Sequence, residues 1–241
     1  GRFYSWDDRI TVVPRPLQKP HPPLWVAATQ ADTCQMAGEY GIGLLMPALN
    51  SPDKLAPQVK VYKDAIATTT DPAGMFVNDQ CALFAVTSCN DDDDFARTVG
   101  GSAALWYVDT IKEIYANDWR GTPLDQVPDS YRAHVAARQA GASGAGNFAA
   151  EIPVVSDSRE IIDQFIDAGA FLVGDPDRVI DNVRKYRAIG GDRLVCVMQL
   201  ADLRHEDIMR SIELFGTKVM PAIAADEAAE AAASARAGAR S

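Results

Sequence analysis

The chain has 241 residues, of which 47% are hydrophobic and 23% charged, as in a globular domain with a sizeable core. Its formal net charge is −10, and a surface of this sign repels phosphate backbones, which excludes nucleic acid as a partner. No apolar run approaches the ~18 residues needed to cross a bilayer, so no membrane segment is predicted. Because residues 1–4 lack the basic and apolar regions of a signal peptide, we expect a cytoplasmic protein.

The cysteines and histidines are scattered along the chain. The four cysteines include no CxxC pair, so we interpret them as reduced thiols in apolar segments. A zinc site needs clustered ligands, and we predict no metal site. His21, in a proline-rich segment, and His205, at a helix start, have no visible acidic partner for general-base catalysis, and both are interpreted as structural.

The first predicted elements form one βαβ unit. Residues 1–23 alternate weakly and then become rich in proline, which predicts a strand pair leading into a rigid extended connection. Residues 24–28 and 42–46 are short apolar runs typical of strands buried on both faces. Between them lies a helix of small residues that ends at Tyr40, with Gly41 in the position of a C-terminal capping glycine.

The middle of the chain continues this pattern and then interrupts it. Residues 51–67 have helical spacing with an N-terminal Ser-Pro pair, and residues 80–88 predict a third buried strand. Residues 94–150 form an insertion, and one this long in a βα array is usually a lid or pocket wall. Within it we expect a helix over 96–116, an interruption at 120–123, a helix near 130–139 and a small-residue loop over 141–146.

Regular alternation returns near residue 158. A helix over 158–168 is followed by Phe171–Gly174 and by a helix that begins after Asp175-Pro176 and ends at Gly190-Gly191. The last buried strand is predicted over 193–199, and residues 208–215 line the last amphipathic helix. Residues 222–241 are rich in alanine and acids with no apolar stripe for docking, and we expect this tail to have no catalytic role.

The four clearest strand predictions (24–28, 42–46, 80–88 and 193–199) alternate with amphipathic helices. This order indicates an α/β fold with parallel strands and βαβ crossovers. A closed barrel of this kind needs eight strands, so half of them are absent from the predicted set.

A series of short motifs resembles the bacterial luciferase-like flavin-dependent monooxygenases. Gly1-Arg2-Phe3-Tyr4 and the proline-rich run Val13–Ala27 are similar to the segment that leads into the fifth barrel strand of that family. Further similar motifs, in the family's own order, are Ala28–Thr33, Ala37–Ile42, Val173–Val179, Gly190–Arg193 and Ser211–Pro221. The resemblance covers residues 1–221 and implies a (β/α)8 TIM-barrel type fold, present here as a C-terminal partial barrel with a helical insertion.

The turn after the first strand is the candidate cofactor site. Barrel active sites lie at the C-terminal ends of the strands. Thr29, Gln30 and Thr33 lie there, at a helix N-terminus whose backbone N–H groups attract anions. The resemblance places the cofactor phosphate near this turn, whereas an ordinary N-cap would need only Thr29 or Asp32.

Other candidate residues each have a structural alternative. The cofactor candidates also include Val26, Ala27 and Ala28. A flavin ring or ribityl chain could lie against these residues, or they could simply pack inside the barrel. Candidate substrate contacts are Trp106, Met198 and Gln199, although the aromatic stripe that contains Trp106 is also typical of a helix core. Helix capping explains Gly174-Asp175-Pro176. A solvated turn with favourable charge at a helix N-terminus explains Asp91–Asp94. Catalytic residues are unknown, because no GxSxG, P-loop or GxGxxG motif is present.

The resemblance implies an enzyme that oxygenates a small organic substrate with reduced FMN and O₂, since a flavin carries most of the chemistry itself. A separate flavin reductase is the implied partner. One alternative is an oxidoreductase of the same fold that depends on the deazaflavin F420. Another is a non-catalytic flavin-binding protein or truncated paralogue. Because the family's N-terminal strands are missing from the sequence, we expect this chain alone to be inactive and, with its uncovered strand edges, to self-associate as a homo-oligomer.

Overall fold

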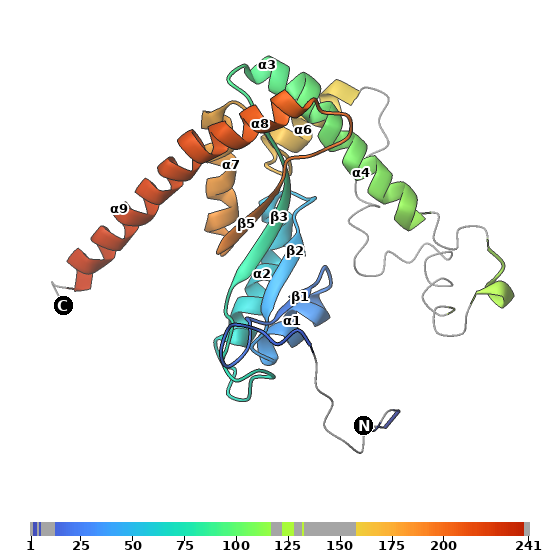
Figure 1. The fold of residues 1–241 in the computed structure, drawn as a ribbon, viewed down its shortest axis with the longest axis vertical. Coiled ribbons are helices and arrows are strands. Elements are labelled where there is room, and N and C mark those ends of the chain that lie inside the picture. Colours follow the sequence, from blue (N-terminus) through green and yellow to red (C-terminus); the bar gives the residue numbers. More distant parts are fainter. Residues whose placement is uncertain are drawn as a thin grey trace.

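The computed structural model describes residues 2–3, 5, 13–116, 122–127, 132 and 158–238, and a parallel β-sheet lies at its centre (Figure 1). Four strands lie side by side in the order β1 (Trp25–Ala27), β2 (Gly43–Pro47), β3 (Cys81–Cys89) and β5 (Arg193–Val197). A short strand, β4 (Leu172–Gly174), pairs with the last three residues of β3. All pairs are parallel, so the C-terminal ends of the strands meet at one edge of the sheet.

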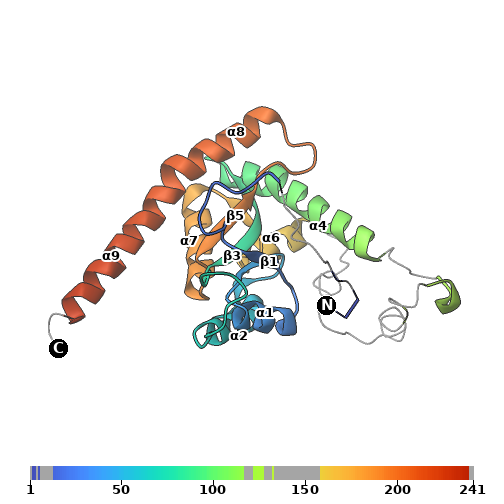
Figure 2. The same cartoon turned by 60° about the horizontal axis from the view of Figure 1, so that its bottom comes forward.

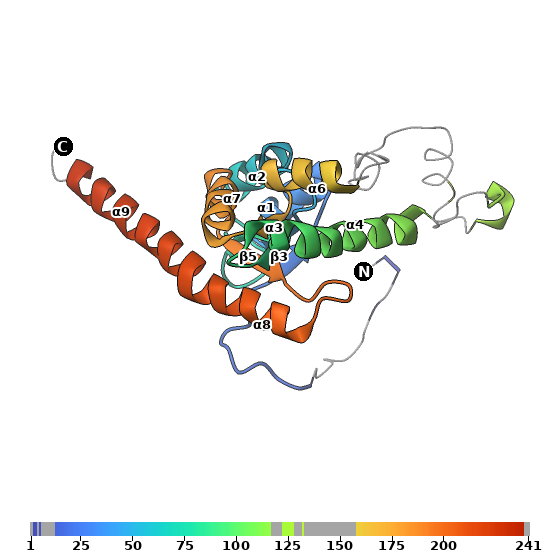
Figure 3. The same ribbon diagram turned by 90° about the horizontal axis from the view of Figure 1, so that it is seen from above.

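One face of this sheet is covered by helices. Helices α1 (Ala31–Glu39), α2 (Pro52–Ile66) and α7 (Pro176–Ala188) lie on the same side of the strands (Figures 1 and 3). Alternate strand residues such as Leu44 and Leu83 are fully buried against them. This parallel α/β arrangement confirms the predicted partial barrel.

The predicted strands agree with the structure to within two residues at each end, with one omission. β4 was not predicted as a strand, since it is three residues long and ends at Gly174, whose φ is +145°. A Cβ at Gly174 would lie 2.6 Å from Cδ of Arg178. The helix stops were predicted correctly: Gly41 and Gly190 both have positive φ, a conformation that glycine adopts without steric cost.

The second face of the sheet is partly uncovered, which corrects the prediction that β1 and β5 are buried on both faces. Trp25 is 39% exposed and Val195 is 42% exposed. Both strands pair with only one neighbour among the described residues, so each is an edge strand. A short apolar run predicts burial only where a neighbouring strand or helix covers it.

A second group of helices packs at the C-terminal end of the sheet. The predicted helix over 96–116 is confirmed, but it is built from α3 (Asp93–Phe95), a π-helix η1 (Ala96–Gly100) and α4 (Gly101–Ala116). Helix α6 (Ser158–Asp167) packs beside α4 through Ile162 and Ile166, and a short 3₁₀ helix η2 spans Leu124–Gln126. The predicted helix near 130–139, except Arg132, and the predicted loop over 141–146 lie outside the described residues.

The C-terminal helices include the first part of the tail predicted over residues 222–241. α8 (His205–Leu214), a π-helix η4 (Phe215–Val219) and α9 (Met220–Gly238) run without interruption, so the boundary predicted at residue 222 lies inside α9. Ala222 and Ile223 pack against the main core, and Arg184 on α7 donates to Asp226 at 2.8 Å. The first turns of the tail are therefore docked, and the rest of α9 extends away from the sheet (Figure 2).

The proline-rich segment before β1 lies partly within the described region. Residues 13–23 contain no strand, and most of the predicted strand pair lies outside the described residues. His21 stacks on Phe76 with ring centroids 4.7 Å apart, and its Nε2 accepts a hydrogen bond of 2.8 Å from the Met75 N–H. His21 thus joins two loops, in agreement with the structural role predicted for it.

Candidate active site

The strand ends carry the sequence-predicted site residues to one edge of the sheet. Thr29 and Gln30 follow β1, and Met198 and Gln199 follow β5. β1 and β5 are the two outer strands, separated by β2 and β3. The cofactor candidates and the substrate candidates therefore occupy the same edge of the sheet but opposite ends of that edge.

The turn after β1 leads directly into helix α1. The Ala28 N–H donates to the Leu45 carbonyl at 3.0 Å, which extends strand pairing to the start of the turn. The N-cap residue is Gln30, and its side chain makes no capping hydrogen bond. The cap predicted as the structural alternative, from Thr29 or Asp32, is thus not the arrangement found. The first N–H groups of a helix have no intrahelical acceptor, so they remain available to a bound anion.

The three polar residues of this turn are Thr29, Gln30 and Thr33. All three are half-buried, so their side chains lie at the surface. Asp32, also in the first turn, is exposed, and its negative charge opposes anion binding. The donor set of backbone amides and hydroxyl groups suits a phosphate group, with Asp32 as the unfavourable element.

The small residues of β1 divide between the two faces of the sheet. Val26 and Ala28 pack into the helix-covered core, with Ala28 only 5% exposed. Ala27 is exposed on the other face. Of these three cofactor candidates, Ala27 is therefore the one that a ligand on the uncovered face can reach.

Close packing fixes the position of α1. A Cβ at Gly38 would lie 2.6 Å from the Cβ of Ala65 and 2.8 Å from the carbonyl oxygen of Tyr62, so α1 and α2 touch at this glycine. The Tyr62 hydroxyl in turn donates to the Gln80 carbonyl at 3.1 Å. These contacts fix the position of helix α1 and its N-terminal turn, and they leave no space for a larger residue at position 38.

The aromatic stripe on α4 separates into two environments. Tyr107 and Ile111 pack against the second core, as the structural alternative predicted. Trp106 is 52% exposed and lines a cleft of about 660 Å³ between α4 and the segment that follows β5. Ala201 and Asp202 form part of the opposite wall, two and three residues after Gln199. The structure thus brings Trp106 to the loop that carries the other substrate candidates.

Each aspartate of the Asp91–Asp94 run has a partner, and all but Asp93 are exposed, as expected for a solvated turn. Asp92 accepts from the Phe95 N–H at 3.1 Å and caps α3. The others form ion pairs with arginines on distant elements: Asp91 with Arg210, Asp93 with Arg178 and Asp94 with Arg159. Sequence spacing does not reveal these arginines, which lie 65 or more residues away.

Asp93 is the central member of this rim network. Its Oδ1 accepts from Arg178 Nε at 3.0 Å and from the Asp175 N–H at 3.2 Å. Asp175 caps α7 through a 2.9 Å bond from the Arg178 N–H, as the sequence predicted. The strong hydrogen bond to Asp93 raises the pKa of the Arg178 guanidinium, which stays charged. The network fixes the start of α7 against the start of α3.

The cysteines do not form a reactive site. Cys34, Cys81 and Cys89 are buried and Cys196 is half-buried, and all four are free thiols. Burial raises the pKa of Cys34 and Cys196 to about 11 and that of Cys81 and Cys89 to about 12. The thiolate is the nucleophile and the metal ligand, so these side chains are unreactive at neutral pH. Within the described ranges, no three acids, cysteines or histidines gather into a metal site.

The family follows from the sequence match. The family model for luciferase-like monooxygenases matches residues 1–193, which is most of the chain. The chain belongs to this family. The resemblance carried by the motifs of the sequence is thereby confirmed.

Solved structures with TM-scores above 0.5 share the same fold. Monooxygenase RslO1 from Streptomyces bottropensis is 20% identical with a TM-score of 0.56, and the match covers 88% of this chain and 51% of that one. A second match, with a TM-score of 0.52, is the oxygenating constituent of 3,6-diketocamphane monooxygenase from Pseudomonas putida, solved in complex with FMN. It is 21% identical, and the match covers 83% of this chain and 49% of that one. The F420-dependent tetrahydromethanopterin reductase from Methanopyrus kandleri is 22% identical with a TM-score of 0.48, with 83% of this chain and 50% of that chain covered.

These matches define how much of the fold this luciferase-like chain contains. The chain spans about half the length of the solved structures that it matches. No curated protein matches it. In the part of the chain that the structure describes, no helix is both long enough and apolar enough to cross a membrane.

Proposed function

We propose that this chain forms the FMN-phosphate side of a flavin-dependent monooxygenase that oxygenates a small organic substrate with reduced FMN and O₂. Membership of the luciferase-like family supports the reaction class. The observation that carries the cofactor assignment is the N-terminus of α1, where the N-cap side chain leaves the first amides uncapped at the edge where barrel active sites lie.

In this proposal, the reduced flavin supplies the reaction with O₂. The backbone N–H groups at the start of α1 and the hydroxyl groups of Thr29 and Thr33 hold the phosphate, with Gln30 beside them. Ala27 gives the ring or ribityl chain an open surface. Trp106, Met198 and Gln199 shield and orient the substrate.

The assembly that we propose includes further partners. A separate reductase delivers the reduced flavin. The uncovered sheet face and the edge strands β1 and β5 favour association with a second copy of the chain, because exposed strand edges offer unpaired N–H and C=O groups. We further propose that the barrel domain spans residues 1–221, with residues 94–150 as an insertion. The cytoplasmic location also stays a prediction.

Cofactor titration tests the proposal. FMN, reduced FMN and F420 are titrated separately into the chain, and binding is followed by isothermal titration calorimetry. We expect FMN to bind and the Thr29→Ala/Thr33→Ala variant to bind it at least ten-fold more weakly, since two donors to a charged group are lost. Thr217→Ala is the matched control, because the Thr217 hydroxyl bonds to the Glu213 carbonyl of its own helix.

The other outcomes separate the alternatives. Binding of F420 without FMN would replace the monooxygenase proposal by the F420-dependent oxidoreductase. FMN binding that does not change in the double threonine variant would refute the phosphate site. FMN binding without turnover would indicate a non-catalytic flavin-binding protein.

A further inference from the structure

The cleft beside Trp106 has the composition of a small-molecule site. Its volume of about 660 Å³ lies within the range of ligand pockets. On one wall, Phe95, Val99, Ala103 and Trp106 lie at helical spacing along α3, η1 and α4. Leu203 faces them from the segment after β5. With Ala201, the apolar part of the cleft is therefore lined by two aromatic and four aliphatic side chains.

The backbone is unusual on both walls of this cleft. On one side, residues 96–100 form a π-helix instead of an α-helix. On the other, Ala201 has a φ of +45°, a left-handed conformation that is strained for a non-glycine residue. Both features are frequent at functional sites. Their occurrence on opposite walls of one cleft is a second observation, independent of its shape.

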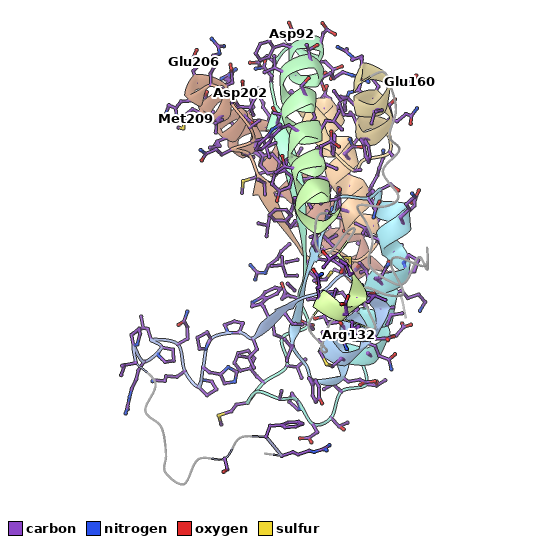
Figure 4. The ribbon with its side chains drawn as sticks, turned by 90° about the vertical axis from the view of Figure 1, so that its right-hand side faces the viewer. Asp92, Arg132, Glu160, Asp202, Glu206 and Met209 are labelled. Atoms are coloured by element: carbon purple, nitrogen blue, oxygen red, sulfur yellow. The ribbon has the colours of Figure 1, made fainter. Side chains whose placement is uncertain are left out.

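The rim of the cleft is negatively charged. Arg204 is engaged by two acids, because its Nε donates to Asp207 at 2.9 Å and its Nη1 lies 2.7 Å from Glu206. Asp202 makes no ion pair with any residue in the described ranges. Figure 4 shows Asp202 and Glu206 at the end of α8 that lies beside α4. The charged residues that line the cleft are Asp202, Asp207 and Arg204, which leaves a net negative charge beside Trp106.

We propose that this cleft binds a planar aromatic molecule that carries a protonated amine. The ring of such a ligand packs between Trp106, Phe95 and Leu203, and its ammonium group lies toward Asp202. Acidic groups and the face of a tryptophan ring both attract a cation. The bound molecule would be the enzyme's substrate, and this role rests on the proposed monooxygenase function. The binding of the molecule to the cleft does not depend on that function.

Three naphthalene probes of nearly equal size test the charge preference: 2-naphthylmethylamine, 2-naphthylmethanol and 2-naphthoate. Each is titrated into the full chain by isothermal titration calorimetry in the absence of flavin. We expect the amine to bind about five-fold more tightly than the alcohol, from one favourable charge interaction near the surface. The naphthoate should bind more weakly than the alcohol.

Two variants and their controls locate the probe. Trp106→Ala should weaken amine binding at least ten-fold, and Asp202→Asn should remove the preference for the amine while it leaves binding of the alcohol unchanged. Trp25→Ala, another partly exposed tryptophan, and Asp71→Asn, an exposed loop aspartate, are the matched controls. Circular dichroism confirms that each variant is folded.

The outcomes are independent of the flavin proposal. Equal affinity for the three probes, no binding of the amine, or amine binding that survives Trp106→Ala would overturn the inference. If the amine binds and FMN does not, the cleft is confirmed as a binding site and the monooxygenase proposal fails. If FMN binds and the amine does not, the monooxygenase proposal stands and this inference fails.

Discussion

Asp93 and Arg178 join the start of α3 to the start of α7, with Oδ1 of Asp93 3.0 Å from Nε of Arg178. The same carboxylate oxygen also accepts from the Asp175 N–H. One side chain therefore stabilises both a distant arginine and the backbone at a helix start. Surface ion pairs usually contribute little, but a pair that also holds a backbone donor should contribute more.

Asp93→Asn should lower the free energy of unfolding by about 1–2 kcal/mol, because it replaces a charged acceptor by a neutral one. Urea denaturation followed by circular dichroism measures the change. Asp64→Asn is the control, since Asp64 forms an exposed i,i+4 pair with Lys60. That control should change stability by about 0.5 kcal/mol or less. Equal effects of the two variants would mean that the rim network adds nothing beyond a surface pair.

Gly38→Ala should destabilise the protein by about 1–3 kcal/mol, the usual cost of overpacking a tight contact. The added Cβ would meet the backbone of α2, which cannot move aside as a flexible side chain would. Gly216→Ala is the matched control, because no atom lies within 4 Å of its added Cβ. In this helical position alanine should instead stabilise by up to about 1 kcal/mol. Thermal unfolding of both variants under the same conditions checks the opposite signs.

The buried thiols predict a loss of stability at alkaline pH. Their pKa values are raised from 9.0 to about 11 or 12 by burial. The unfolded chain therefore loses thiol protons near pH 9, while the folded chain keeps them. The stabilisation is fully present below pH 9 and is lost as the pH rises from 9 toward 11–12, by up to about 1.4 kcal/mol per pH unit for each thiol.

Denaturant unfolding between pH 8 and 10 measures this slope. The Cys34→Ala/Cys89→Ala variant should lose stability less steeply than the parent chain, whatever its stability at pH 8. Met75→Ala, at an exposed position that does not titrate, should keep the parent slope. A slope that is the same in all three proteins would contradict the assignment to the thiols.

Local signals in the sequence were sufficient to predict much of the fold. Apolar runs gave the four main strands, Gly41 and Gly190 gave two helix ends, and Asp175-Pro176 gave the start of α7. These features depend on residues a few positions apart. β4 was missed because a three-residue strand has too few side chains to show a period.

The site was less predictable because its parts come from distant segments. The spacing of Phe95, Val99 and Trp106 along the helix is visible in the sequence, but the opposite wall begins at Ala201, about a hundred residues later. The sequence likewise could not reveal that Trp106 faces a cleft while Tyr107 faces the core. Such differences arise from packing between elements and not from spacing within one.

The open edge of β5 provides the last prediction. Val195 is 42% exposed on the uncovered face of the sheet. In the parallel pairing of β3 with β5, it lies beside Phe84. Beside it, Arg193 and Leu194 line a groove of about 1080 Å³ between α7, β5 and α9. Parallel sheets are normally covered on both faces, so this strand should be a site of self-association.

Val195→Lys should therefore shift the chain toward monomer, because a charge on an edge strand opposes pairing with another strand. Sedimentation velocity over a wide range of concentrations measures the change. Val77→Lys, at a loop position that is 40% exposed, introduces the same charge away from the sheet and should leave the association state unchanged. A monomeric parent chain would contradict the prediction, as would identical behaviour of the two variants. The second result would mean that added charge, and not the strand edge, controls association.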